Sequence, residues 1–124
     1  MQEIKKSMLG LSEIPGNNIT ARFIFQPDFT GFKGHFPGKP VLPGVCKIQA
    51  VISMIEKWHE KNVCLKEISL AKFFASVSCN QEILISSGKL VDGPDETKIR
   101  ASVTSDGKKI AELHSKLSVK DRKF

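Results

Sequence analysis

A rigid loop that runs directly into a helix limits the fold of this 124-residue chain more than any other feature. The loop is rich in proline and glycine and reads Gly34-His35-Phe36-Pro37-Gly38-Lys39-Pro40-Val41-Leu42-Pro43-Gly44. Because proline fixes φ at about −65° and glycine reaches conformations that are closed to other residues, such a run dictates one backbone path. The imidazole of His35 is thus held in a stiff loop. That loop ends at a helix N-terminus, whose free N–H groups can bind a negatively polarised oxygen.

The helix is predicted over residues 45–61 by apolar residues at helical spacing. This apolar stripe consists of Val45, Ile48, Ile52, Ile55 and His59, widened by Val51 and Trp58. Gln49 lies at the edge of the stripe, on one row with Val45, Ile52 and Glu56. A single helix with so long an apolar face needs a sheet to cover it.

Alternation of apolar and polar residues predicts strands on both sides of the helix. One strand is expected within residues 5–14 and a second over 19–26, joined as a hairpin by the turn at 15–18. Four more are expected at 68–77, 82–91, 97–103 and 111–119, the last two joined by the hairpin signal Asp106-Gly107. The pattern predicts a single α+β domain over residues 1–124, with an antiparallel sheet curled around one central helix.

Charge and composition argue against several classes of protein. The formal net charge is +6, but the basic residues are scattered and no aromatic ladder lies among them. We therefore expect no nucleic-acid role, and either an acidic protein partner or a merely solvated basic surface explains the charge. Cys46, Cys64 and Cys79 are odd in number and widely spaced, which predicts reduced thiols and no metal site. No apolar stretch approaches the roughly 18 residues that span a membrane, and the N-terminus lacks a signal-peptide pattern, so we expect a cytoplasmic protein.

The twelve residues from Gly34 to Val45 resemble the β-hydroxyacyl-[acyl-carrier-protein] dehydratases of bacterial fatty-acid synthesis. In that family a "GHFPG-x-PV-hydrophobic-PGV" sequence surrounds the catalytic histidine and is followed by a helix. The resemblance implies the hot-dog fold and an acyl thioester substrate, carried by an acyl carrier protein or coenzyme A. It also implies a homodimer or larger assembly with the site across an interface, and no cofactor.

The same resemblance assigns roles to individual residues of the loop. His35 would be the base that takes the α-proton of a 3-hydroxyacyl thioester, and the backbone N–H of Gly44 would bind the thioester carbonyl as enolate character develops. Loss of one such preorganised donor can cost on the order of 100-fold in rate. Substrate binding is assigned to four residues that would border the acyl chain: Phe36, Pro37, Gly38 and Val45.

Gln49 departs from the family pattern, because the family has Glu or Asp six residues after the proline of "PGV". A carboxamide cannot act as a general acid, and acid–base assistance is typically worth ~10²–10⁴-fold. In one interpretation the chain is still a dehydratase, with another group moving the proton; Glu56 is about two turns away and is not expected to reach. In a second, a different hot-dog subunit supplies a carboxyl that completes the site with His35.

A third interpretation is that the fold binds acyl thioesters for other chemistry, such as hydrolysis or isomerisation, or for none. We expect dehydration of a 3-hydroxyacyl thioester first. The alternatives are a non-catalytic or partner-dependent acyl-thioester-binding subunit and a hot-dog thioesterase.

Overall fold

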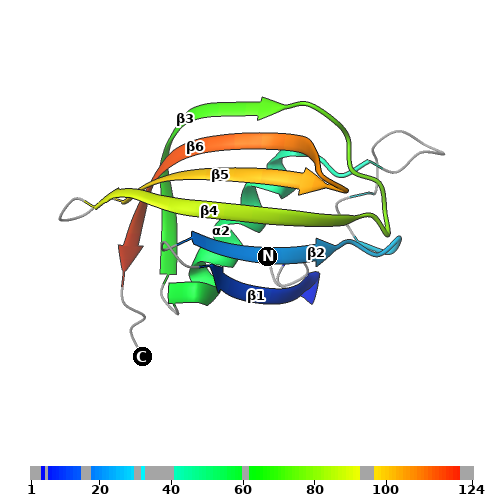
Figure 1. Cartoon of the computed structure of the whole chain (residues 1–124), viewed down its shortest axis with the longest axis horizontal. Helices are drawn as coiled ribbons and strands as arrows, with labels where there is room; N and C mark the ends of the chain where they lie inside the picture. Colours follow the sequence, from blue (N-terminus) through cyan, green and yellow to red (C-terminus); the bar gives the residue numbers. More distant parts are fainter. Residues whose placement is uncertain are drawn as a thin grey trace.

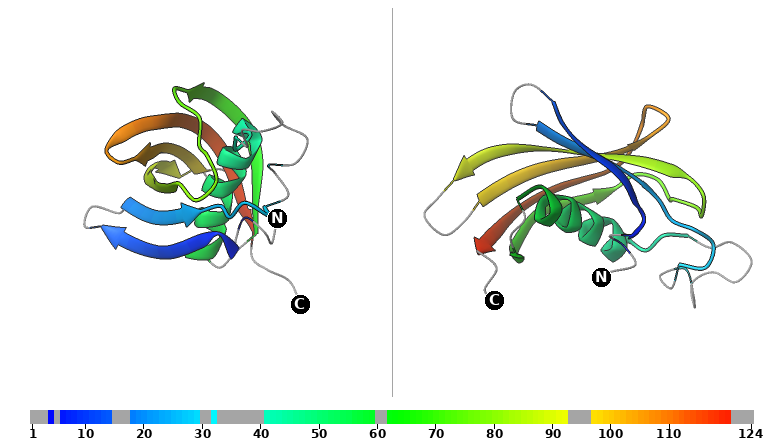
Figure 2. Two further views of the ribbon diagram at one scale, coloured as in Figure 1. Left: turned by 90° about the vertical axis from the view of Figure 1, so that its right-hand side faces the viewer. Right: turned by 90° about the horizontal axis from the view of Figure 1, so that it is seen from below.

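The computed structural model describes residues 4, 6–14, 18–29, 32, 41–59, 62–92 and 97–120. Six strands and one helix have bounds within these ranges: β1 (Met8–Ile14), β2 (Asn18–Ile24), α2 (Gly44–His59), β3 (Asn62–Phe73), β4 (Glu82–Asp92), β5 (Thr97–Ser105) and β6 (Lys108–Lys120). The strands form one antiparallel sheet in the order β1-β2-β4-β5-β6-β3. The sheet curls, and α2 lies against its concave face (Figures 1 and 2). The predicted α+β arrangement is therefore confirmed.

Both predicted hairpins are present. β1 pairs with β2 in a register that places Leu11 opposite Ala21. At the β5–β6 turn Asp106 has a φ of 51° and Gly107 a φ of 77°. Positive φ at both central residues matches the right-handed twist of the flanking strands, which is why Asp-Gly is favoured there.

The core lies between the concave face of the sheet and the helix. Strand residues that alternate along β2, β4, β5 and β6 point inward, and burial of each large apolar side chain contributes about 1.5–3 kcal/mol. They are Ile19, Ala21, Phe23, Ile83, Ile85, Ile99, Ala101, Val103, Leu113 and Leu117. Ala50, Val51, Met54 and Ile55 of α2 pack against them. Within the described residues, no helix is long and apolar enough to cross a membrane.

The predicted apolar stripe of the helix is wrong at its first residue and at Trp58, which is 37% exposed. Val45 is 68% exposed, whereas all residues from Ala50 to Ile55 are buried. The middle of α2 is covered on every side, so helical periodicity alone could not show which face meets the sheet. The helix face that packs into the core includes Lys47. Because lysine is charged, the hydrophobic pattern did not mark this position as buried.

β3 also differs from its predicted range, because it begins at Asn62 and ends at Phe73. Its first residues pair with the end of β6, starting with Asn62 opposite Lys120. Register shifts near Leu65 and Leu70 interrupt the alternation, which hid this part of the strand. Beyond Phe73 the chain leaves the ladder, and the N–H groups of Phe74 and Ala75 both donate to the carbonyl of Ile110.

Candidate active site

The segment that leads into α2 is fixed to the turn between β3 and β4. The N–H of Leu42 donates to the carbonyl of Val77 over 2.7 Å, and Val41 forms an isolated antiparallel bridge with Ser78. The Pro43 carbonyl then accepts the N–H groups of Cys46 at 3.0 Å and Lys47 at 3.3 Å. These contacts set where the helix begins.

Gly44 is the first residue of α2, so its N–H group has no acceptor within the helix. A side chain at this position would meet the ring of Phe73, since a Cβ on Gly44 would lie 3.1 Å from Phe73 Cζ. The close approach of the ring means that any larger residue here would have to displace Phe73 slightly. The predicted oxyanion donor is thereby part of a tightly packed corner between α2 and the end of β3.

His35, Phe36, Pro37 and Gly38 lie outside the described residues, so their assigned roles stay predictions. What is described is an aromatic cluster just before them in the chain. The ring centroids of Phe25 and Phe29 are 4.8 Å apart, and those of Phe29 and Phe32 are 5.7 Å apart with the rings edge to face. Phe32, which is only 5% exposed, anchors the chain three residues before His35. The sequence interpretation missed this cluster, although its phenylalanines at 25, 29 and 32 were visible.

Two further predicted site residues, Val45 and Gln49, lie on the first turns of α2. Val45 is exposed and Gln49 is partly buried, and the helix row that they share runs to the buried Ile52. Glu56, the carboxyl on this row, is used elsewhere: its Oε2 accepts the N–H of Val63 at 3.1 Å, at the start of β3. The structure thus separates Glu56 from the helix N-terminus where the chemistry is expected.

Lys47 is a residue that the sequence interpretation did not single out. It is 5% exposed, its Nζ donates to the carbonyl of Ala75 over 3.2 Å, and Nζ lies 5.3 Å from the centroid of the Phe73 ring. Burial lowers the pKa of this ammonium group. The adjoining cavity between α2 and the sheet is about 10 Å³, about the room that one water needs. That cavity is too small to hold an acyl chain.

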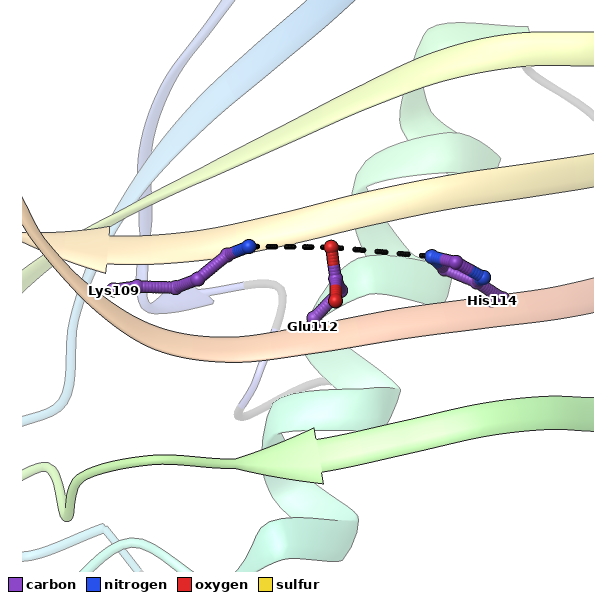
Figure 3. A network of polar contacts seen from close by, with 3 residues as sticks. All are labelled: Lys109, Glu112 and His114. Atoms are coloured by element: carbon purple, nitrogen blue, oxygen red, sulfur yellow. Dashed lines mark hydrogen bonds and ion pairs between the residues drawn. The ribbon is translucent and has the colours of Figure 1, made fainter.

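A polar network lies on β6, on the strand face away from the core (Figure 3). Glu112 Oε1 is 3.2 Å from Lys109 Nζ and 3.9 Å from His114 Nε2. The hydrogen bond from Lys109 holds the pKa of Glu112 below its usual value. His114 thus faces a surface carboxylate rather than the core. Lys109 Nζ also lies 5.9 Å from the ring centroid of Phe74, which is 55% exposed.

Comparison with known proteins finds similar dehydratases. The model of the family described as "ApeI-like: ApeI dehydratase" matches residues 12–112. The 3-hydroxyacyl-[acyl-carrier-protein] dehydratase FabZ of Rickettsia akari is 28% identical over 97% of this chain and 81% of that protein. The FabZ of Enterococcus faecalis is 32% identical over 83% of this chain and 72% of that protein.

Solved structures share the fold at low sequence identity. A chain of the dehydratase heterocomplex ApeI:P from Xenorhabdus doucetiae aligns with a TM-score of 0.72 and 19% identity, over 90% of this chain and 96% of that one. A hypothetical thioesterase with coenzyme A from Streptococcus pneumoniae aligns with a TM-score of 0.70 and 6% identity, over 93% and 88%. These similarities support the fold alone. With the match over residues 12–112, the chain belongs to the ApeI-like dehydratase family and has the hot-dog fold that its loop sequence predicts.

Proposed function

We propose that this protein dehydrates 3-hydroxyacyl thioesters of fatty-acid or related acyl-chain synthesis. His35 takes the α-proton, the N–H of Gly44 binds the thioester oxygen as it becomes enolate-like, and the C–O bond to the 3-hydroxyl breaks. The hydroxyl leaves as water once an acid protonates it, which Gln49 cannot do and a carboxyl of a second subunit could. The observation that carries the proposal is the start of α2, where Gly44 is held between the Leu42–Val77 hydrogen bond and the ring of Phe73. Its free N–H group suits a developing oxyanion.

The site requires a second subunit in this proposal. Among the described strands β3 lies at the edge of the sheet, so one side of it has no strand partner there. Its apolar residues Ile68 (41%) and Phe73 (49%) are unusually exposed, as is Phe74 (55%), which directly follows the strand. The cavity beneath α2 is too small for an acyl chain, which fits a channel formed between subunits. We therefore infer a homodimer, or a pair with another hot-dog chain, joined through β3.

The amide at position 49 bears on which of these two assemblies would have a complete active site. A homodimer would have a carboxamide in both sites, whereas a second hot-dog subunit with Glu or Asp could supply the missing acid. That the similar Xenorhabdus chain comes from a dehydratase heterocomplex supports the second arrangement. An acidic carrier protein suits the exposed cations at the end of β3 and the start of β6, where Lys109 lies over the exposed ring of Phe74 and Lys72 lies opposite Glu112 across the strands.

The test uses 3-hydroxybutyryl thioesters of acyl carrier protein and of coenzyme A, and follows enoyl absorbance. We expect slow turnover by the wild type, an increase of ~10²–10⁴-fold in Gln49→Glu, and none above background in His35→Ala. Gln26→Glu is the matched control, because it adds the same charge at an exposed site after β2 and should change nothing.

Two other results would contradict dehydration. Release of free thiol without enoyl product would assign a thioesterase. Binding of an acyl thioester without either reaction, in the wild type and in Gln49→Glu, would assign a binding subunit.

A further inference from the structure

Lys47 is a buried cation that forms no ion pair with the carboxylates of the described part of the chain, although Glu112 also lines the small cavity beside it. Its Nζ contacts the Ala75 carbonyl and the face of the Phe73 ring, and neither contact carries a full negative charge. Burial of an ammonium group without an ion pair is costly. The lowered pKa of Lys47 reflects that cost.

The position of Lys47 within the helix adds a second cost. It lies in the first turns of α2, where the helix dipole is positive and cations are unfavourable. The first turn contains no acidic residue to offset this charge. Stability alone would favour an apolar residue such as Met at position 47.

The geometry gives the cation a place beside the oxyanion donor. Helical side chains tilt toward the helix N-terminus, so Lys47 extends toward Gly44, three residues before it. The ring of Phe73 touches both sites, since it packs on Gly44 and lies 5.3 Å from Lys47 Nζ. The Ala75 carbonyl, which accepts the hydrogen bond from Lys47, lies two residues before Val77. The Val77 carbonyl accepts the N–H of Leu42, just before the helix begins.

We infer that Lys47 is a positioning residue for the dehydration. It holds Phe73 and Ala75 against the start of α2, and its charge strengthens the positive potential that the Gly44 N–H presents to the developing enolate. The inference rests on the proposed function. The positive potential acts more strongly as negative charge develops on the substrate, so it stabilises the transition state more than the bound substrate, which is the condition for raising kcat.

The test is Lys47→Met, which keeps the length and apolar stem of the side chain. We expect kcat to fall about 10- to 100-fold, less than the roughly 10²- to 10³-fold loss of a donor that touches the oxyanion, while KM changes less than about threefold because ground-state binding is little affected. The midpoint of thermal unfolding should stay or rise, since Ala75 is exposed and its carbonyl can bind water instead. Lys47→Arg, which keeps the charge, should recover most of kcat, and Lys57→Met at an exposed position of α2 is the control.

Each contrary result has its own meaning. An unchanged kcat in Lys47→Met, with an active wild type, would overturn the inference and leave the proposed function intact. A lower unfolding midpoint together with a lower kcat would overturn it in favour of a purely structural lysine. If the wild type and Gln49→Glu turn over no thioester, either alone or together with a second hot-dog subunit that carries Glu or Asp at the matching position, the proposed function itself is overturned.

Discussion

The ring of Phe73 occupies the space that a side chain at Gly44 would need, with 3.1 Å between Phe73 Cζ and a Cβ built on Gly44. Most real Cβ contacts are longer than this, so a side chain at position 44 would require the half-exposed Phe73 ring to move by a few tenths of an ångström, and position 44 and the end of β3 are coupled. The first residue of the helix therefore packs against a residue 29 positions further along the chain. The contact between Gly44 and Phe73 is a tertiary contact, so the loop sequence alone could not predict it.

Gly44→Ala should destabilise the protein by about 1–3 kcal/mol through overpacking against Phe73, although Ala is the better helix former. Because the N–H remains, Gly44→Ala/Phe73→Leu should recover both stability and turnover. Chemical unfolding and steady-state kinetics of both variants measure this. Recovery of stability without turnover would show that Phe73 has a role beyond making room.

Glu56 is expected to act in folding and not in proton transfer. Its carboxylate accepts the Val63 N–H, so Glu56→Ala should lose about 1 kcal/mol of unfolding free energy. Glu56→Gln keeps an acceptor oxygen and should retain both stability and kcat. A large drop of kcat in Glu56→Gln, with unchanged stability, would instead make Glu56 the missing acid.

Local sequence rules predict most of the fold, because most of its strands repeat a simple alternating period. β4, β5 and β6 alternate between core and solvent, and the Asp106-Gly107 turn specifies its own backbone conformation. The family pattern in the loop supplied the rest of the prediction. Rules of this kind fail where burial depends on distant neighbours.

The burial of Lys47 is a feature that local sequence rules could not predict. A lysine is ordinarily a solvent-facing residue, and only its place on one face with Ala50, Val51 and Met54 could have marked it as buried. The exposure of Val45 likewise depends on where the sheet ends, which helical periodicity does not encode. The first half of β3 was missed because bulges break its alternation.

The edge strand β3 gives a test of the inferred assembly. Ile68→Lys places a charge on an exposed apolar position of this edge, and should convert a dimer to monomer, since an edge lysine opposes strand pairing. Light scattering after gel filtration measures the mass. Thr104→Lys is the control, because it adds the same charge to β5, whose two neighbours are already paired. A monomeric wild type, or a dimer unaffected by Ile68→Lys, would contradict association through β3.

Cys46 tests whether the start of α2 activates a thiol. A helix N-terminus can lower a thiol pKa, but here burial raises the pKa of Cys46, so less thiolate is present at neutral pH than in an ordinary cysteine. We expect iodoacetamide to modify Cys46 more slowly than the exposed Cys64 at pH 7, as measured by peptide mass spectrometry. The rate at Cys46 should increase as the pH is raised toward its elevated pKa, because the thiolate is the reacting form. Preferential modification of Cys46 at pH 7 would mean that the positive end of the helix outweighs burial, and would make this thiol a reactive group beside the proposed oxyanion donor.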